Sequence, residues 1–555
     1  MKKTHKLVPA LGVFLLLLFS LAIGDEKTSR VDKIFAQWDR PDSPGCALAI
    51  IENGKIIYER GYGSANLENA VPISPDSVFY IGSCSKQFTA ASIALLARQG
   101  KLSLDEEMRK YVPELPDYGG SLTVQQLIHH TSGLRDYLTL LDIAGLPFGY
   151  FHKDDVLELI SRQKELNFKP GEEYLYSNSG YFLLAVIVER VSGKSLRQFA
   201  EENIFASLGM KNTNFHDDYT MIIKNRASGY FPAGKEKFKN YISTFDCVGS
   251  GGLYSTVKDL FLWDQNFYKP KVGDREWLNL IQTPGTLNNG EKLNYAFGLV
   301  LGKYKGLKTV EHGGALEGYR ANMLRFPEQN FSVICLSNLS SFNPGRLCQQ
   351  VADIYLSSQF KEEKPKKKLA EGKFLTLSEN ALKEKVGTFL EPKTGAMIKL
   401  FIKEGRLISE FMGQNFPLAA MSETEFEVLE APVNAILIFE KKSEGKPFLI
   451  HVSVEGEKPM TYEAIEPFSP SPDELAEYQG DYSSEELQVT FKLAVKDGKL
   501  YFVHKNAPQS PLSPLLHDRF VMRGNQINFI RGDEKKISAF TLNAGRVRNL
   551  RFNKK

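Results

Sequence analysis

The chain has 555 residues, which is too long for one ordinary hydrophobic core, so two or three domains are expected. Hydrophobic residues make up 42% of the chain and charged residues 24%, a balance that excludes a disordered, collagen-like or coiled-coil protein. The formal net charge is only +3, so the composition implies no nucleic-acid partner.

Residues 1–24 are predicted to be a secretory signal peptide. Three lysines precede an apolar run over residues 7–23, and small residues lie at positions 22 and 24, where a signal peptidase would cut. A single transmembrane anchor is the alternative interpretation of this segment. We therefore expect export to the periplasm or the extracellular space, with no stable membrane span after cleavage.

Residues 25–360 mix helical and strand patterns and are predicted to form the first domain. Asn53 and Gly54 separate two apolar runs, which is a hairpin signal. An apolar stretch over 78–82 leads into a helix predicted over 83–99, with Gly100 as its C-cap. Later, a polar loop precedes an apolar helix over 181–191, and a turn at 312–314 is expected between strand-like segments.

The end of the chain repeats itself. A charged segment over 361–373, predicted to be a linker, is followed by two similar regions, predicted as domains 374–464 and 465–555. Five positions recur at an offset of 93: Leu382, Gly387, Phe389, Gly405 and Leu407 return as Leu475, Gly480, Tyr482, Gly498 and Leu500. Both copies have short strands with turn signals, so each is expected to be a small antiparallel barrel or sandwich.

Ser-x-x-Lys occurs five times, so the motif alone selects no site. The pairs are Ser83/Lys86, Ser161/Lys164, Ser255/Lys258, Ser358/Lys361 and Ser443/Lys446. Only Ser83 follows an apolar stretch and opens an apolar helix, where residues i and i+3 share a face. The start of a helix also offers free backbone N–H groups to a developing oxyanion. An ordinary N-cap is the alternative role for Ser83.

Two further motifs each occur once, Tyr176-Ser177-Asn178 and His312-Gly313-Gly314. In an extended loop residues i and i+2 project the same way, so a phenol and an amide can address one site. The two glycines would let a substrate backbone approach closely.

The cysteines and the paired histidines predict no metal site. Five cysteines are scattered, without a C-x-x-C pair or a Cys/His cluster of metal spacing. Cys84 lies beside Ser83, but a thiol enzyme is disfavoured because no nearby histidine pairs with it. His129 and His130 are adjacent and point apart, so they are interpreted as structural.

The three motifs, in this order, resemble those of the penicillin-recognising serine hydrolases. That superfamily contains serine β-lactamases of class C, D,D-peptidases of the penicillin-binding-protein type, esterases and D-aminopeptidases, and the resemblance covers roughly residues 35–355. It implies an α+β catalytic domain in which helices surround an antiparallel sheet, followed here by two small lipocalin-like β-barrels. It also implies an enzyme without a metal or another cofactor.

The resemblance assigns a role to each motif. Ser83 would attack a carbonyl and form an acyl-enzyme, and Lys86 or Tyr176 would take the serine proton. A free lysine titrates near 10.4 and a free tyrosine near 10, so either must shift by about 3 units, and the choice stays open. Asn178 would orient Lys86 and the substrate amide, and the N–H groups of Ser83 and Ala315 would form the oxyanion hole.

The third motif departs from the pattern of many relatives, which begin it with a lysine that holds a substrate carboxylate. His312, with an ordinary pKa near 6.5, would be about one-quarter charged at pH 7 and a weaker anchor. D-aminopeptidases also carry histidine there, and their architecture combines a catalytic domain with barrels. We therefore expect a D-aminopeptidase-like or D,D-peptidase-like enzyme acting on a small molecule or peptide, with peptidoglycan fragments among the candidates.

Two alternatives stay open. One is a carboxylesterase or weak β-lactamase with the same site. The other, of a different class, is a non-catalytic protein that binds penicillin or peptidoglycan.

Overall fold

The computed structural model describes residues 26–555 apart from 148, 150, 362–373, 393–394, 412–413, 431–434, 442–447, 455–458, 467 and 504–509. The predicted signal peptide therefore lies outside the described residues, as does nearly all of the predicted linker. The internal contacts divide the chain into two units, Met1–Leu141 with Leu146–Glu363, and Lys364–Lys555 with Asp142–Gly145. Each unit is described by itself.

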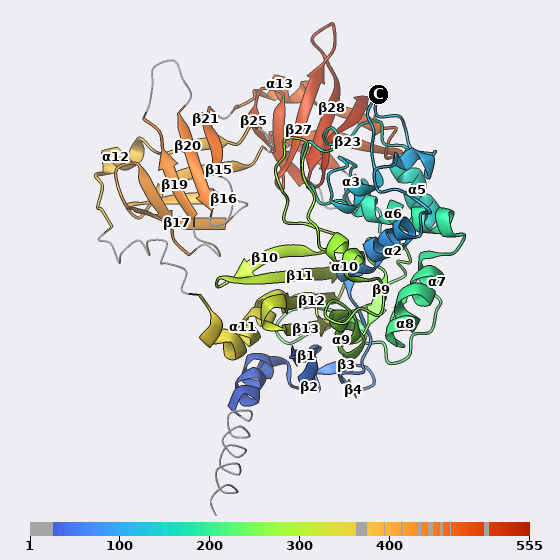
Figure 1. Cartoon of the computed structure of the whole chain (residues 1–555). Coiled ribbons are helices and arrows are strands. Elements are labelled where there is room, and N and C mark those ends of the chain that lie inside the picture. The colour runs from blue at the N-terminus through green and yellow to red at the C-terminus, as the bar shows by residue number, and fades with distance from the viewer. Residues whose placement is uncertain are drawn as a thin grey trace, which may run out of the picture. The chain divides into compact units, whose positions relative to one another are not determined.

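The first unit is built on a six-stranded antiparallel sheet with the order β10-β11-β12-β13-β1-β2 (Figure 1). The strands are β1 (Cys46–Glu52), β2 (Lys55–Tyr62), β10 (Val300–Tyr304), β11 (Leu307–Leu316), β12 (Tyr319–Phe326) and β13 (Phe331–Ser337). The hairpin predicted at Asn53-Gly54 joins β1 to β2, and both turn residues have the positive φ that this turn requires (53° and 78°). The sheet thus unites the beginning and the end of the unit.

Helices cover both faces of this sheet. The Ser332 hydroxyl of β13 donates to the Asp264 carboxylate of helix α9 (Val257–Asn266) at 2.8 Å. The next residue, Val333, points to the other face and belongs to the same buried apolar cluster as Leu347 of helix α11 (Pro344–Leu356). Strand β1 is buried on both faces, so its sequence does not alternate between apolar and polar residues and is apolar throughout Cys46–Ile51.

The remaining elements of the unit are short strands and helices. The strands are β3 (Ser64–Asn66), β4 (Val71–Pro72), β5 (Phe79–Tyr80), β6 (Asn214–Phe215), β7 (Gly229–Pro232), β8 (Phe238–Tyr241) and β9 (Leu253–Ser255). Besides a helix over residues 26–35, the α-helices are α2 (Lys86–Arg98), α3 (Val124–Ile128), α4 (Tyr137–Ala144), α5 (Lys153–Ser161), α6 (Asn178–Ser192), α7 (Leu196–Ala200), α8 (Ala206–Leu208), α9 (Val257–Asn266), α10 (Arg275–Ile281) and α11 (Pro344–Leu356). A π-helical turn spans Glu201–Phe205, and 3₁₀ turns span Ala36–Trp38, Gly82–Ser85 (η2), Met108–Lys110, Pro327–Gln329 and Ser357–Gln359.

Each sequence repeat of the second unit forms a closed eight-stranded barrel (Figure 1). The first contains β14 (Gly387–Leu390), β15 (Met397–Lys403), β16 (Arg406–Phe411), β17 (Gln414–Ala420), β18 (Glu425–Val428), β19 (Ala435–Phe439), β20 (Leu449–Val454) and β21 (Met460–Ile465). The second contains β22 (Gly480–Ser484), β23 (Val489–Lys496), β24 (Lys499–Val503), β25 (Ser510–Leu516), β26 (Arg519–Met522), β27 (Asn525–Arg531), β28 (Ile537–Ala544) and β29 (Val547–Lys554). The short helices α12 (Glu379–Lys383) and α13 (Pro472–Glu477) precede them.

The predicted fold class is confirmed, an α+β unit followed by two all-β barrels. The repeated Gly387 and Gly480 each begin the first strand of a barrel. All five cysteines are buried free thiols. No helix among the described residues is both long enough and apolar enough to span a membrane.

Candidate active site

Ser83 and Lys86 lie at the start of the buried helix α2. Ser83 is in the 3₁₀ turn η2, and Lys86 is the first residue of α2, so the helix predicted from residue 83 begins with a tighter turn. The ammonium group of Lys86 donates to Ser83 Oγ at 3.1 Å. The Ser83 side chain therefore accepts a hydrogen bond from Lys86, and no side-chain cap bond forms at the start of either helical segment.

The Lys86 ammonium group is fully buried and has two further acceptors, which come from distant parts of the unit. It donates to Asn178 Oδ1 at 2.9 Å and to the backbone carbonyl of Ser250 at 2.6 Å. Three donors of one ammonium group thus meet three oxygens, which compensates much of the cost of removing the charge from water. The arrangement holds the ammonium nitrogen beside the serine hydroxyl.

Asn178 reaches this cluster because it begins helix α6. Ser177 is the N-cap, and its side chain accepts from Gly180 N. The carboxylate of Asp136 accepts from Asn178 N at 2.6 Å, as expected for an acid at a helix start. Asn178 had been expected in a loop with Tyr176, and that expectation is wrong, because Ser177 starts the helix one residue earlier. Helix α6 packs against α2, which brings the two motifs together.

Tyr176 remains in the loop and lies beside Lys86, whose ammonium nitrogen is 4.7 Å from the centre of the phenol ring. The ring of His130 lies against it, with ring centroids 4.2 Å apart. His130 Nδ1 accepts from Ser177 N at 3.1 Å. His130 was interpreted as a structural residue, and here it contacts both Tyr176 and Ser177 of the Tyr-x-Asn motif.

His312 is buried under this cluster and is uncharged at neutral pH. Burial, and then the Lys86 ammonium group, lower the pKa of His312 to about 4, so the expected one-quarter charge at pH 7 is wrong. Its Nδ1 contacts the Gly313 carbonyl at 2.6 Å, and its Nε2 lies 3.1 Å from the Tyr295 hydroxyl. A neutral imidazole cannot hold a substrate carboxylate by charge.

The His-Gly-Gly motif lies inside strand β11 and does not form the expected turn. The turn of the hairpin follows at residues 317–318, where Glu317 has a φ of 50°. Gly314 is needed because the strand touches the turn η2, so that a Cβ atom there would lie 1.9 Å from Ile81 O. Likewise, a Cβ atom on Gly82 would lie 2.6 Å from Ala315 N. The backbones around Ser83 and Ala315 are therefore in close contact.

Strand β11 has an open edge beside Ser83. Strand β10 pairs with β11 only from Leu307 to Glu311, and no strand in the described part of the chain pairs with that edge farther along. Gly313 and Ala315 are exposed there, while His312 and Gly314 point inward. An extended substrate segment can add to such an edge through backbone hydrogen bonds.

Two residues of the cluster have no signal in the local sequence. Ser250 contributes a backbone carbonyl, which no motif can identify, and Tyr295 is one tyrosine among many. Cys84 stays outside the chemistry, because burial raises the pKa of its thiol to about 12 and it donates to the His312 carbonyl.

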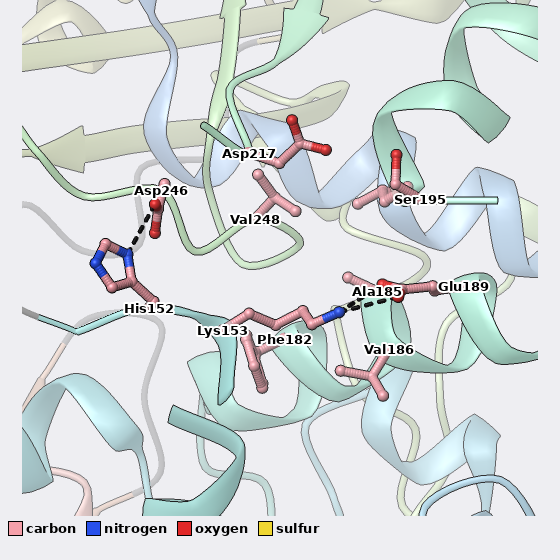
Figure 2. Close-up of a pocket in the computed structure, with 11 residues that line it drawn as sticks. His152, Lys153, Phe182, Ala185, Val186, Glu189, Ser195, Asp217, Asp246 and Val248 are labelled. Atoms are coloured by element: carbon pink, nitrogen blue, oxygen red, sulfur yellow. Dashed lines mark hydrogen bonds and ion pairs between the residues drawn. The ribbon is translucent and has the colours of Figure 1, made fainter. Parts of the chain in front are cut away.

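A separate cavity of about 350 Å³ lies beside helix α6 and contains none of the motif residues. Figure 2 shows the ion pairs at its rim, Lys153 with Glu189 and His152 with Asp246, both at 2.9 Å. The serine in this cavity, Ser195, caps helix α7 by accepting from Gln198 N. The cavity therefore does not provide a second activated serine.

Known sequences resemble the chain in these same regions. A family model described as Beta-lactamase matches residues 31–352. Penicillin-binding protein 4* from Bacillus subtilis is 32% identical over 319 residues, covering 53% of this chain and 68% of that protein. A D-aminopeptidase from Gluconobacter oxydans is 26% identical over 455 residues, covering 81% of this chain and 82% of that enzyme.

Solved structures share the fold. An octameric penicillin-binding protein homologue from Pyrococcus abyssi has a TM-score of 0.55 and 24% identity, and the match covers 79% of this chain and 99% of that one. The D-amino acid amidase from Ochrobactrum anthropi has a TM-score of 0.51 and 23% identity, with 60% and 99% covered.

Proposed function

The chain belongs to the beta-lactamase family and is a serine hydrolase, and from this premise we propose that it is an exported peptidase of the D-aminopeptidase or D,D-peptidase type. The observation that carries the proposal is the Lys86 ammonium group, which is buried and donates to Ser83 Oγ, Asn178 Oδ1 and the Ser250 carbonyl. A serine hydroxyl held in this way suits nucleophilic attack on a carbonyl.

The proposed reaction has two steps through an acyl-enzyme. Ser83 Oγ attacks the scissile carbonyl, the C–N bond breaks, and the amine leaves with a proton. Water then attacks the ester and releases the acid. The N–H groups of Ser83 and Ala315 would stabilise the oxyanion, which the close contact of their backbones supports.

Proton transfer is assigned to Lys86 and Tyr176 together. Lys86 contacts the hydroxyl directly, and its ammonium group also lies over the Tyr176 ring, so the charge of one affects the other. Asn178 would hold Lys86 and the substrate amide. The substrate would lie along strand β11, at the segment formed by His312, Gly313 and Gly314.

The substrate class is proposed from the third motif and from the relatives. A neutral His312 disfavours substrates that need a cation beside the scissile bond, such as many β-lactams. The Gluconobacter D-aminopeptidase matches 81% of this chain, so the likeness extends beyond the catalytic unit. Ester hydrolysis is the second candidate, because an activated serine with an oxyanion hole also cleaves esters.

One panel of substrates tests the proposal. Wild type and Ser83→Ala are compared on a D-alanyl p-nitroanilide, a p-nitrophenyl ester and a chromogenic cephalosporin. We expect turnover of the anilide and the ester, slow turnover of the cephalosporin, and none in the variant. Rapid turnover of the cephalosporin alone would contradict the peptidase assignment.

A second experiment separates an enzyme from a binding protein. Intact protein is treated with a fluorophosphonate, and the adduct is located by mass spectrometry. We expect the adduct on Ser83, whereas no adduct would favour a protein that binds penicillin or peptidoglycan fragments without catalysis.

Export and the domain boundaries are part of the proposal. We infer that residues 1–24 are removed during secretion and that 25–360, 374–464 and 465–555 are separate domains, with residues 361–373 linking the first to the second. N-terminal sequencing of protein from the exported fraction should begin at residue 25. An intact residue 1 on membrane-bound protein would instead indicate an anchor.

A further inference from the structure

We propose that Glu317 selects substrates whose acyl group carries a positive charge, above all a free α-ammonium group. This inference rests on the proposed function, because it concerns the part of the substrate that would stay on Ser83.

Glu317 lies at the end of the strand edge along which the substrate would extend. It follows Ala315 by two residues, or about 7 Å along a strand. Ala315, near the end of strand β11, is exposed, and Glu317 is the first residue of the turn that follows the strand. A substrate whose carbonyl oxygen binds at Ala315 N would therefore direct its acyl group toward the β11–β12 turn.

The Glu317 carboxylate is partly buried in an aromatic and hydroxyl-rich surrounding. Burial, the larger effect, raises the pKa of Glu317, while hydrogen bonding to Ser243 and Tyr241 acts against the increase. Negative charge on Glu317 raises the pKa of Tyr80 and Tyr254, beyond the larger effect of burial, so these rings are also near.

Among the described residues, no cation forms an ion pair with this carboxylate. Its Oε1 atom is buried and has no hydrogen-bond partner among the described residues. The adjacent Arg320 donates to the backbone carbonyls of Glu317 and Tyr319, at 3.1 and 2.6 Å, and forms no ion pair with the carboxylate in the described part of the chain. A buried carboxylate without a cation is costly. A cationic ligand would supply the missing partner.

Two tyrosines near Glu317, Tyr80 and Tyr254, connect it to the candidate site. Tyr80 lies three residues before Ser83, and its hydroxyl accepts from Gly252 N at 2.9 Å, in the segment that follows Ser250. Tyr254 packs against Tyr80 with ring centroids 5.3 Å apart. The aromatic wall beside Glu317 is therefore continuous with the segment that holds Lys86.

The test compares substrates that differ only in one charge. The full-length wild type and Glu317→Gln are assayed with D-alanyl and N-acetyl-D-alanyl p-nitrophenyl esters and with the corresponding p-nitroanilides. Glu328→Gln is the matched control, because Glu328 is an exposed carboxylate paired with Lys308 at 2.7 Å.

We expect the wild type to prefer the free amine, and Glu317→Gln to lose at least about tenfold in kcat/KM for that substrate alone. The loss should come mainly from KM, since the contact exists before and during the reaction. The Glu328 variant should keep the wild-type preference. Equal losses on amine and acetylated substrates would mean that Glu317 only holds the turn, and would overturn the inference.

The two possible failures are distinguishable. A wild type that cleaves the esters without preferring the amine overturns the role of Glu317 and leaves the serine hydrolase intact. Turnover of the esters but of neither anilide contradicts the peptidase assignment, while the ester pair still tests Glu317. A wild type that cleaves nothing and takes no fluorophosphonate label contradicts both proposals.

Discussion

Lys86 differs in its burial from the lysines of the Ser-x-x-Lys matches at Ser161, Ser255 and Ser358, and the motif does not encode this difference. The fifth match, Ser443/Lys446, lies outside the described residues. Lys258 follows Ser255 at the same spacing, but it is partly exposed and pairs with Asp76 at 2.9 Å. Lys86 is fully buried and meets Asn178 and Ser250. The position of Ser83 before an apolar helix predicted the pair only together with the Tyr-x-Asn and His-Gly-Gly motifs, whereas the acceptors of the ammonium group depend on tertiary packing.

Replacing Lys86 by methionine should lower kcat for p-nitrophenyl acetate by about 10³-fold with little change in KM, because the group that contacts the Ser83 hydroxyl and shares in proton transfer is removed while substrate binding is kept. Steady-state kinetics measure both constants. The matched control is Lys258→Met, which should behave as the wild type. A Lys86 variant with more than half of the wild-type kcat would assign the proton transfer to another group.

His312 shows how burial changes the chemistry of a residue that the sequence identifies correctly. The sequence places a histidine at the start of the third motif, and its ordinary pKa suggests partial charge at pH 7. Burial and the Lys86 ammonium group lower that pKa to about 4. Neither cause is visible in the sequence, because both come from residues far away along the chain.

The low pKa of His312 should make the first unit less stable in acid. The unfolded chain binds a proton near pH 6.5, but the folded site binds it only near pH 4, so protonation favours unfolding as the pH falls. Between pH 7 and 4.5 this linkage lowers the free energy of unfolding by about 2 kcal/mol. Urea unfolding followed at 222 nm, where helices dominate, measures it.

In that experiment the free energy of unfolding of the His312→Gln variant should fall by about 2 kcal/mol less than that of the wild type between pH 7 and 4.5. His152→Gln is the control, because its side chain is 55% exposed. Identical acid losses in the wild type and the His312 variant would mean that folding does not lower the pKa of this histidine, and would contradict the prediction.

At the scale of elements, the regular helices and the Asn53-Gly54 hairpin were predicted well, whereas the conformation of the glycines after His312 was predicted wrongly. The hairpin at Asn53-Gly54, the helix α2 and the apolar helix α6 all follow from local signals. Gly313 and Gly314 were expected to form a turn, yet they lie in strand β11. A glycine with a positive φ indicates a turn. Gly314 is instead needed because the backbone of β11 touches the backbone beside the turn η2, and a larger residue would not fit there.

That contact predicts different effects for neighbouring glycines. A Cβ atom on Gly314 would lie 1.9 Å from Ile81 O, so Gly314→Ala must separate β11 from the turn that carries Ser83. We expect kcat to fall by about 100-fold, the cost of a displacement near 1 Å. In Gly313→Ala the nearest atom would be 3.6 Å away, so the loss should be clearly smaller. Equal kinetics in the two variants would show that the strand can shift without effect.

At the scale of the whole molecule, the repeat in the sequence predicted the architecture. Two copies at an offset of 93 residues cannot share one core with the region before them, and each forms its own closed barrel. The residues shared by the copies shape the barrels, so they say nothing about substrates. The site could be found because its motifs are short and local, while the substrate-binding groups, such as Glu317, come from turns whose conformation the sequence does not reveal.

The first unit should carry the complete catalytic cluster. Ser83, Asn178 and Ser250, which contact the Lys86 ammonium group, all lie in this unit, as does His312. A chain of residues 26–361 should therefore hydrolyse p-nitrophenyl acetate with kcat/KM within about threefold of the full chain. Its Ser83→Ala variant gives the background rate, and circular dichroism confirms folding. A second chain that lacks only residues 466–555 separates the two barrels. If the shortest chain is folded but inactive while this second chain is active, the first barrel contributes to the site, and the catalytic unit is not self-sufficient.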